Sequence, residues 1–177
     1  MSFPRGIHAI CPTSLKTNGM GTAELRSPSL QKSWCNVRIG SAPLGFGLVY
    51  AHGILCYDIY SSIPASAADL QRRLTISELP HWCASIEKVL SDAKSSGEIY
   101  CVWGTFHTNR EEMCNGVRFS LPGCPNALQW TVTTGYLPNP LHTVSHLTIN
   151  RTQQDQDFID SMRQFVDDWK VGLEKYW

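Results

Sequence analysis

The carboxyl-terminal segment of the chain, residues 157–177, carries apolar residues at helical spacing. Its main apolar positions follow one another at steps of four, three, four and seven residues, and three further apolar residues widen the same stripe. A stripe of this width predicts an amphipathic helix that covers another layer of structure. The stripe and its flank consist of Phe158, Met162, Phe165, Trp169 and Tyr176, with Ile159, Val166 and Leu173.

Apolar and polar residues alternate with a period of two in several other segments, which is typical of half-buried strands. The last four of these segments are joined by short connections and therefore predict an antiparallel meander. The polar run 107–112 is expected to form the first of these connections, so that Arg110, Glu111 and Glu112 lie at a hairpin tip. The predicted strands cover 33–40, 48–50, 54–60, 99–106, 117–121, 128–134 and 143–150.

Two further segments, 64–74 and 80–94, have apolar residues at helical spacing, and a proline stands in the first turn of each. Together with the predicted strands they indicate an α+β fold. We expect a mostly antiparallel sheet of five to seven strands, with two or three helices packed on one face and a long amphipathic helix at the carboxyl terminus. The single α+β domain is predicted to span 33–177.

Residues 1–32 contain glycine and proline at irregular intervals, which break every periodic pattern. We therefore expect an irregular or flexible arm. The same region lacks the uninterrupted apolar run of a secretory signal, and no segment of the chain approaches the roughly 18 apolar residues of a membrane span. These observations predict a soluble, cytoplasmic protein that does not insert into membranes.

Charge gives a second constraint on function. Fifteen basic residues balance fifteen acidic residues, and the pI is about 7.0. A balanced charge provides no general attraction for nucleic acid, so we expect no nucleic-acid partner.

The seven cysteines are an odd number, and none forms a C-x-x-C pair. Four of them lie in apolar runs, where free cysteine behaves as a small hydrophobic residue. Most are therefore expected to be reduced. One scattered Cys2His2 set is conceivable, but its spacing matches no compact zinc-ligand pattern, so neither a metal nor another cofactor is predicted. That set is Cys114, Cys124, His142 and His146.

Sequence motifs for phosphate loops, dinucleotide binding, zinc proteases and nucleophile elbows do not occur in the chain. Polar residues of the meander face are the weak catalytic candidates: a thiol and an imidazole can form a nucleophile and its base if they meet across strands. On one continuous strand, Cys101 and His107 would be about 20 Å apart and could not bond directly. The catalytic candidates are Cys101, His107, Arg118 and His146.

Ligand or partner contacts are expected from aromatic residues, from a polar sheet face and from the rigid loop 122–126. The candidates are Trp103, Trp130, Thr131, Thr133, Cys124 and Asn126. The leading hypothesis is a small binding protein without catalysis, which engages a protein partner as inhibitors and immunity proteins do, or an apolar small ligand. The alternative is an enzyme that uses polar residues on the 98–150 meander face. The sequence leaves the oligomeric state open.

Overall fold

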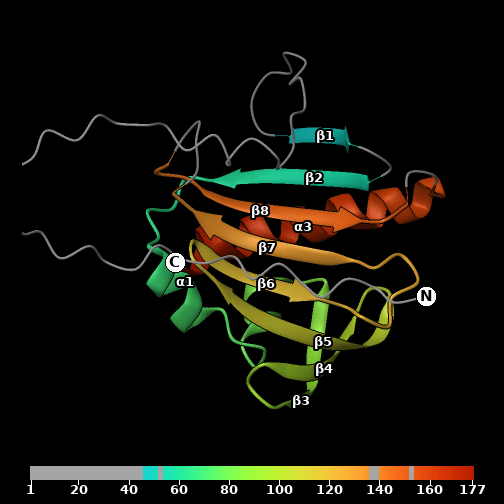
Figure 1. Ribbon diagram of the computed structural model, residues 1–177, viewed down its shortest axis with the longest axis horizontal. Coiled ribbons are helices and arrows are strands. Elements are labelled where there is room, and N and C mark those ends of the chain that lie inside the picture. Colours follow the sequence, from blue (N-terminus) through green and yellow to red (C-terminus); the bar gives the residue numbers. More distant parts are fainter. Residues whose placement is uncertain (1–45, 52–53, 136–139, 152–153) are drawn as a thin grey trace, which may run out of the picture. The chain divides into compact units, whose positions relative to one another are not determined.

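The computed structural model describes residues 46–51, 54–135, 140–151 and 154–177, and for 46–51, 54 and 55 the backbone alone. These residues contain one antiparallel sheet of eight strands in the order β1-β2-β8-β7-β6-β5-β4-β3 (Figure 1). The predicted arm 1–32, the predicted strand 33–40 and the boundary between them lie outside the described residues. The strands are β1 Phe46–Ala51, β2 Ile54–Ser61, β3 Ile86–Asp92, β4 Ser96–Cys101, β5 Gly104–Met113, β6 Gly116–Ser120, β7 Gln129–Thr134 and β8 Thr143–Ile149.

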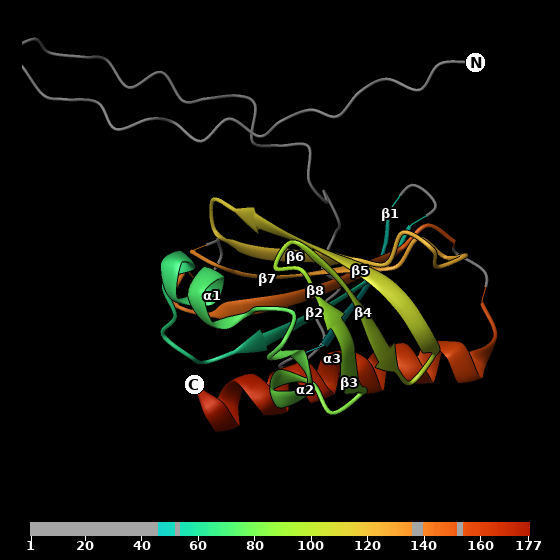
Figure 2. The same cartoon turned by 90° about the horizontal axis from the view of Figure 1, so that it is seen from below.

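Strands β3 to β8 follow one another as a meander, and β2 pairs with the last of them, β8. Three helices accompany the sheet within the described ranges, and the longest, α3, runs along one face of it (Figure 2). The predicted α+β class, its antiparallel sheet and its long terminal helix are therefore confirmed. Seven strands, β2 to β8, reach the upper end of the predicted number, and β1 adds an edge strand. The helices are α1 Ala67–Arg73, α2 Leu79–Trp82 and α3 Gln156–Tyr176.

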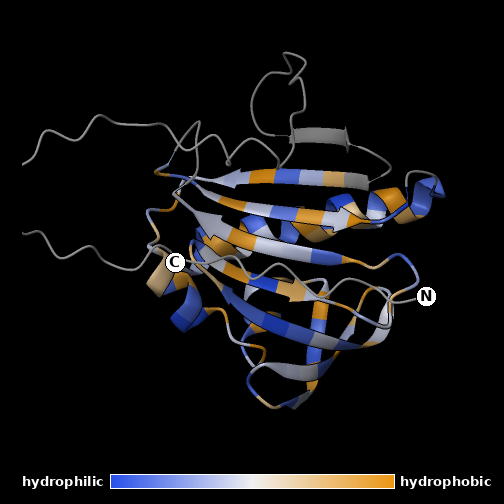
Figure 3. Cartoon of the chain, viewed as in Figure 1, coloured by the Kyte–Doolittle hydropathy of each residue, from blue (hydrophilic) through white to orange (hydrophobic). Residues whose placement is uncertain are grey.

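The apolar stripe that the sequence predicts for α3 packs on the sheet and forms part of the hydrophobic core. Trp169 is 0% exposed, and its ring centroid lies 6.3 Å from those of Phe119 on β6 and Trp130 on β7. Phe165 packs edge-on against Trp130 at 5.2 Å. We call the sheet face that carries Phe119 and Trp130 the inner face and the opposite one the outer face. Hydropathy colouring shows apolar residues recurring along the strands and α3 (Figure 3).

The segment predicted as a helix over 80–94 is mostly a strand, and this prediction is wrong. Helix α2 ends at Trp82, and β3 then forms a hairpin with β4 whose turn includes Lys94 at φ 70°. Two β-bulges in β3, between Ile86 and Lys88 and between Val89 and Ser91, disturb its alternation. Because these bulges leave the inward positions Ile86 and Val89 three residues apart, the strand imitates helical spacing.

The predicted strand 99–106 is also divided. Cys101 pairs with Gly104 across a two-residue turn, Val102–Trp103, so β4 and β5 form a tight hairpin. Gly104 has φ 109°, a left-handed conformation that glycine adopts without a steric penalty. The turn places Cys101 on the inner face and His107 on the outer face, because alternation restarts after it.

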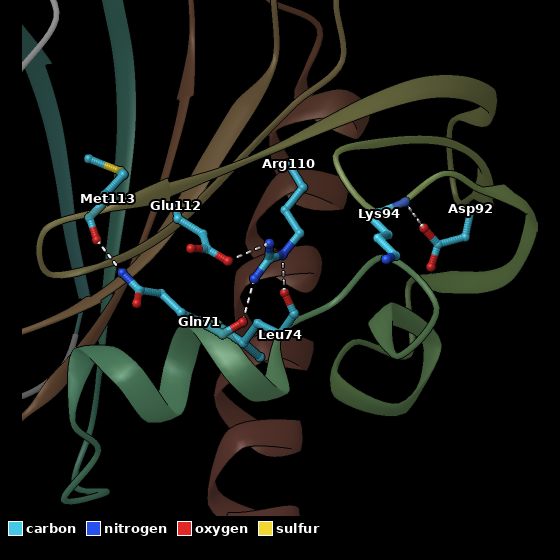
Figure 4. Close-up of polar contacts among 7 residues, drawn as sticks. All are labelled: Gln71, Leu74, Asp92, Lys94, Arg110, Glu112 and Met113. Atoms are coloured by element: carbon cyan, nitrogen blue, oxygen red, sulfur yellow. Dashed lines mark hydrogen bonds and ion pairs between the residues drawn. The ribbon is translucent and has the colours of Figure 1, made fainter.

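Arg110, Glu111 and Glu112 lie inside β5 and not at the predicted hairpin tip, which is formed by Cys114 and Asn115. Arg110 points to the inner face and reaches the carboxyl end of α1 (Figure 4). Its Nε donates to the Leu74 carbonyl at 2.7 Å, and its guanidinium also donates to the Gln71 carbonyl. These carbonyls have no partner within the helix, so the arginine is accommodated in the strand by capping α1.

The oxidation state of the cysteines agrees only in part with the prediction. Cys56, Cys83, Cys101 and Cys124 are free, as predicted. Cys114 is disulfide-bonded and so does not belong to the reduced majority that the sequence predicts. No helix in the described ranges is long and apolar enough to span a membrane.

Candidate functional site

The four catalytic candidates do not meet at one place. Cys101 is 3% exposed and faces the core, where its Sγ lies 3.4 Å from the Gly104 carbonyl. His107 is exposed on the outer face of β5, opposite Glu98 of β4. Arg118 and His146 share that outer face but stand on β6 and β8, with β7 between them.

A row of five polar residues crosses the outer face from β2 to β5. The register places each residue directly opposite the next, on adjacent strands about 4.8 Å apart. The charges are arranged symmetrically about a central hydroxyl, with an acid and a histidine on one side and an arginine and an acid on the other. We call this set the polar row: Asp58, His146, Thr131, Arg118 and Glu111.

His146 and Asp58 form the first ion pair of the polar row, between His146 Nδ1 and Asp58 Oδ1. Both side chains are little exposed, at 29% and 27%. Burial lowers the pKa of His146, but its hydrogen bonds to Asp58 and Cys56 and the attraction of these two groups outweigh burial and raise the pKa to about 10. The imidazole is therefore a cation at neutral pH. Tyr60, on the same side of β2, has a raised pKa because of burial and the nearby Asp58 charge.

Arg118 and Glu111 form the second ion pair. Arg118 Nε donates to Glu111 Oε2 at 2.9 Å, and Nη2 donates to the same oxygen. The two side chains are 40% and 54% exposed, so water screens this pair strongly. Since His146 and Arg118 are each paired with an acidic residue, neither cation of the polar row is left unpaired to bind a ligand.

The candidates for ligand or partner contact are distributed over the fold. Trp130 is buried in the core, whereas Thr131 and Thr133 lie on the outer face. Trp103 packs against α3 and donates from Nε1 to Ser161 Oγ at 2.8 Å.

In the loop between β6 and β7, Cys124 packs against the core, and Asn126 Oδ1 accepts from Gln154 Nε2 at 3.2 Å. Three of the six candidates, Trp103, Trp130 and Cys124, therefore pack in or against the core. Asn126 ties the loop to the segment that precedes α3.

An open hollow of about 340 Å³ lies where the β4–β5 turn meets α3. One wall is apolar, with Tyr100 and Val102, which are 38% and 55% exposed. Two acidic residues, Glu87 and Asp168, are also among the residues that line it. The hollow is lined by Ala84, Ser85, Glu87, Tyr100, Cys101, Val102 and Asp168.

Asp168 is fixed in position by two neighbours. Ser85 Oγ donates to Asp168 Oδ2 at 2.5 Å, and Gln164 Nε2 donates to Oδ1 at 2.7 Å. Burial and the charge of Asp168 raise the pKa of the adjacent Asp167, which Lys170 lowers only in part.

Sequence reasoning missed Asp58, Cys56 and the hollow. Cys56, Asp58 and Tyr60 alternate along β2, so the sequence contains a signal for their common face. The hollow has no such signal, because its lining comes from three distant segments and depends on the turn at Val102. Within the described residues, no group of three histidine, cysteine or acidic side chains is placed to hold a metal ion.

No protein-family model matches this chain, and a comparison with curated proteins gives no match. Among solved structures, the protein XoxI from Bacillus cereus is similar, with a TM-score of 0.48 and 12% identity over 70% of this chain and 94% of that one. An uncharacterised protein from Bacillus thuringiensis is similar with a TM-score of 0.46 and 13% identity, over 68% of this chain and 96% of that one.

Proposed function

We propose that this protein is a binding protein without catalysis, which engages a protein partner in the manner of an inhibitor or immunity protein. The contact surface is the end of the sheet formed by β3, β4 and the turn that follows β4. The observation that carries the proposal is the exposure of three large apolar side chains there, Leu90, Tyr100 and Val102, at 47%, 38% and 55%. Tyr100 and Val102 line the hollow, and exposed apolar residues beside a hollow are typical of protein interaction sites.

We expect the protein partner to contact side chains of this surface and not to add a strand to the edge of the sheet. Strand β3 is the last of the sheet on this side, but its two bulges interrupt a regular hydrogen-bonding edge. Glu87 and Lys88 add charge to this edge, which further disfavours pairing with another strand.

A small apolar ligand between sheet and helices is less well supported. The rings of Phe119, Trp130, Phe165 and Trp169 fill that region, with neighbouring centroids 5.2 to 6.3 Å apart. The enzyme alternative loses Cys101, which lies on the opposite sheet face from His107, Arg118 and His146, and the thiol that does contact His146, Cys56, is only 2% exposed. Cytoplasmic localisation remains a prediction, and the disulfide at Cys114 favours an oxidising compartment instead.

A site-specific photocrosslinker tests the proposed surface. Placed at Val102 in cells that produce the protein, it should yield a discrete crosslinked species whose mass identifies one partner. Leu141, which is 76% exposed in the connection between β7 and β8, is the control position and should not yield that species. Equal crosslinking from both positions, or none from Val102, would contradict the proposal.

A further inference from the structure

We propose that the hollow beside Tyr100 and Val102 receives an arginine side chain of the protein partner. This inference rests on the proposed function and adds the chemistry of the partner. It follows from three properties of the hollow: an apolar wall, two carboxylates and the lack of a basic residue among the residues that line it.

The apolar wall suits the stem of a long basic side chain. Tyr100 and Val102 present exposed apolar surface at the rim, and the methylene groups of arginine pack on such surfaces while the charged end stays polar. Lys88 Nζ lies 5.3 Å from the centroid of the Tyr100 ring, so a guanidinium group that stacks on this ring has to displace the ammonium group of Lys88. A guanidinium group stacks on aromatic rings more readily than an ammonium group does.

The carboxylates provide the matching charge. Glu87 and Asp168 both line the hollow, and Glu87 has no ion pair among the salt bridges of the described residues. Asp168 accepts one hydrogen bond at each oxygen, and a carboxylate has about four acceptor positions, so roughly two remain for a donor fork. Because Ser85 and Gln164 hold this carboxylate in place, little order has to be gained when a guanidinium group binds.

The electrostatic surroundings support the same occupant. The pKa of Asp167 is raised first by burial and then by repulsion from the neighbouring Asp168, whereas Lys170 lowers it. A bound cation relieves this repulsion, whereas an acidic side chain of a partner would increase it. A neutral apolar side chain would contact the wall but would leave the two carboxylates unchanged.

A peptide with a neutral isostere tests the charge directly. The probe is the acetylated and amidated peptide Gly-Ser-Arg-Ser-Gly, compared with the same peptide containing citrulline. Titration followed by NMR should give saturable shifts of the Val102 methyl groups and the Ser85 amide. The citrulline peptide should bind about fivefold more weakly, the loss expected for one partly screened ion pair.

Two variants and one control complete the experiment. Glu87→Gln, at an exposed position, and Asp168→Asn should each weaken the arginine peptide severalfold, while Asp160→Asn should leave binding unchanged. Asp160 lies on the same helix but is exposed and paired with Arg163. Equal affinity for both peptides, or shifts centred on the polar row, would overturn the arginine assignment. If crosslinking at Val102 persists in Glu87→Gln and Asp168→Asn, the proposed partner surface is supported but the arginine assignment is not.

Discussion

His146 on β8 and Asp58 on β2 lie directly opposite each other and form an ion pair on the outer face of the sheet. The two residues are 88 positions apart in the chain, so their contact joins the first described hairpin to the end of the meander. The pair therefore stabilises the pairing of β2 with β8, which joins segments that are far apart in the chain.

The pKa of His146 leads to a prediction about pH. It is raised in the folded protein from 6.5 to about 10, so the pair contributes its full stability below pH 6.5 and loses it as the pH rises towards 10. We expect the difference in unfolding free energy between the wild type and His146→Gln to shrink by about 1–3 kcal/mol across this interval. Urea denaturation at several pH values measures it.

Asp58→Asn provides the control for this pH effect. It removes a group that raises the histidine pKa, so its stability should resemble that of His146→Gln at alkaline pH. A stability difference that stays constant from pH 6 to pH 10 would show that the folded histidine is neutral throughout.

The composition of this outer face could be predicted from the sequence, but its pairings could not. Regular alternation in β6, β7 and β8 places Arg118, Thr131 and His146 on one side. Which strand lies beside β8 depends on the return of β2 from another part of the chain. Local periodicity contains no information about that neighbour, so Asp58 was not recognised as the partner of His146.

Arg110 should be a strong determinant of stability. Its side chain is only 10% exposed and caps the last turn of α1 through the Leu74 and Gln71 carbonyls (Figure 4). Arg110→Met keeps the aliphatic stem but leaves these carbonyls without a donor, which should cost about 2–3 kcal/mol. Arg118→Met, on the exposed outer face, should cost less than about 1 kcal/mol. Chemical denaturation of both variants measures the contrast, and equal losses would contradict the capping role.

Gly172 is required by close packing between α3 and α2. A Cβ at this position would lie 1.9 Å from the Trp82 carbonyl oxygen. Alanine has a higher helix propensity than glycine by about 1 kcal/mol. Gly172→Ala therefore shows whether the steric clash with Trp82 outweighs this gain in propensity. We expect a loss of about 1–3 kcal/mol, because backbone atoms have to move. Val171→Ala, at the exposed neighbouring position, should change the melting temperature little; a stabilised Gly172→Ala would show that the helices are farther apart.

The disulfide at Cys114 changes the expected thiol count. The chain has seven cysteines, and one intramolecular disulfide uses two, which leaves five. Titration of the denatured protein without reductant should therefore give five free thiols, and Cys114→Ser should raise the count by releasing the partner cysteine. A count of seven in the wild type would show that the disulfide does not form in solution.

The β3 segment shows why part of the fold escaped prediction. Apolar spacing distinguishes a helix from a strand only while the strand is regular. The bulges at Ile86 and Val89 remove that regularity, and a bulge depends on the pairing strand β4. The error affected the hollow as well, since Ser85 and Glu87 were assigned to a helix that would have placed them elsewhere.

Trp169 gives the final prediction, because its position was expected from the sequence and is found in the core. The side chain is 0% exposed and lies between α3 and the inner face, near Phe119 and Trp130. Trp169→Ala removes a large buried ring and leaves a cavity, which should cost about 3–5 kcal/mol. Thermal and urea unfolding measure the loss. Glu174→Ala, exposed on the same helix, is the control and should stay close to the wild type. An unchanged melting temperature for Trp169→Ala would mean that α3 is not docked on the sheet, and the hollow that includes Asp168 would then not exist in solution.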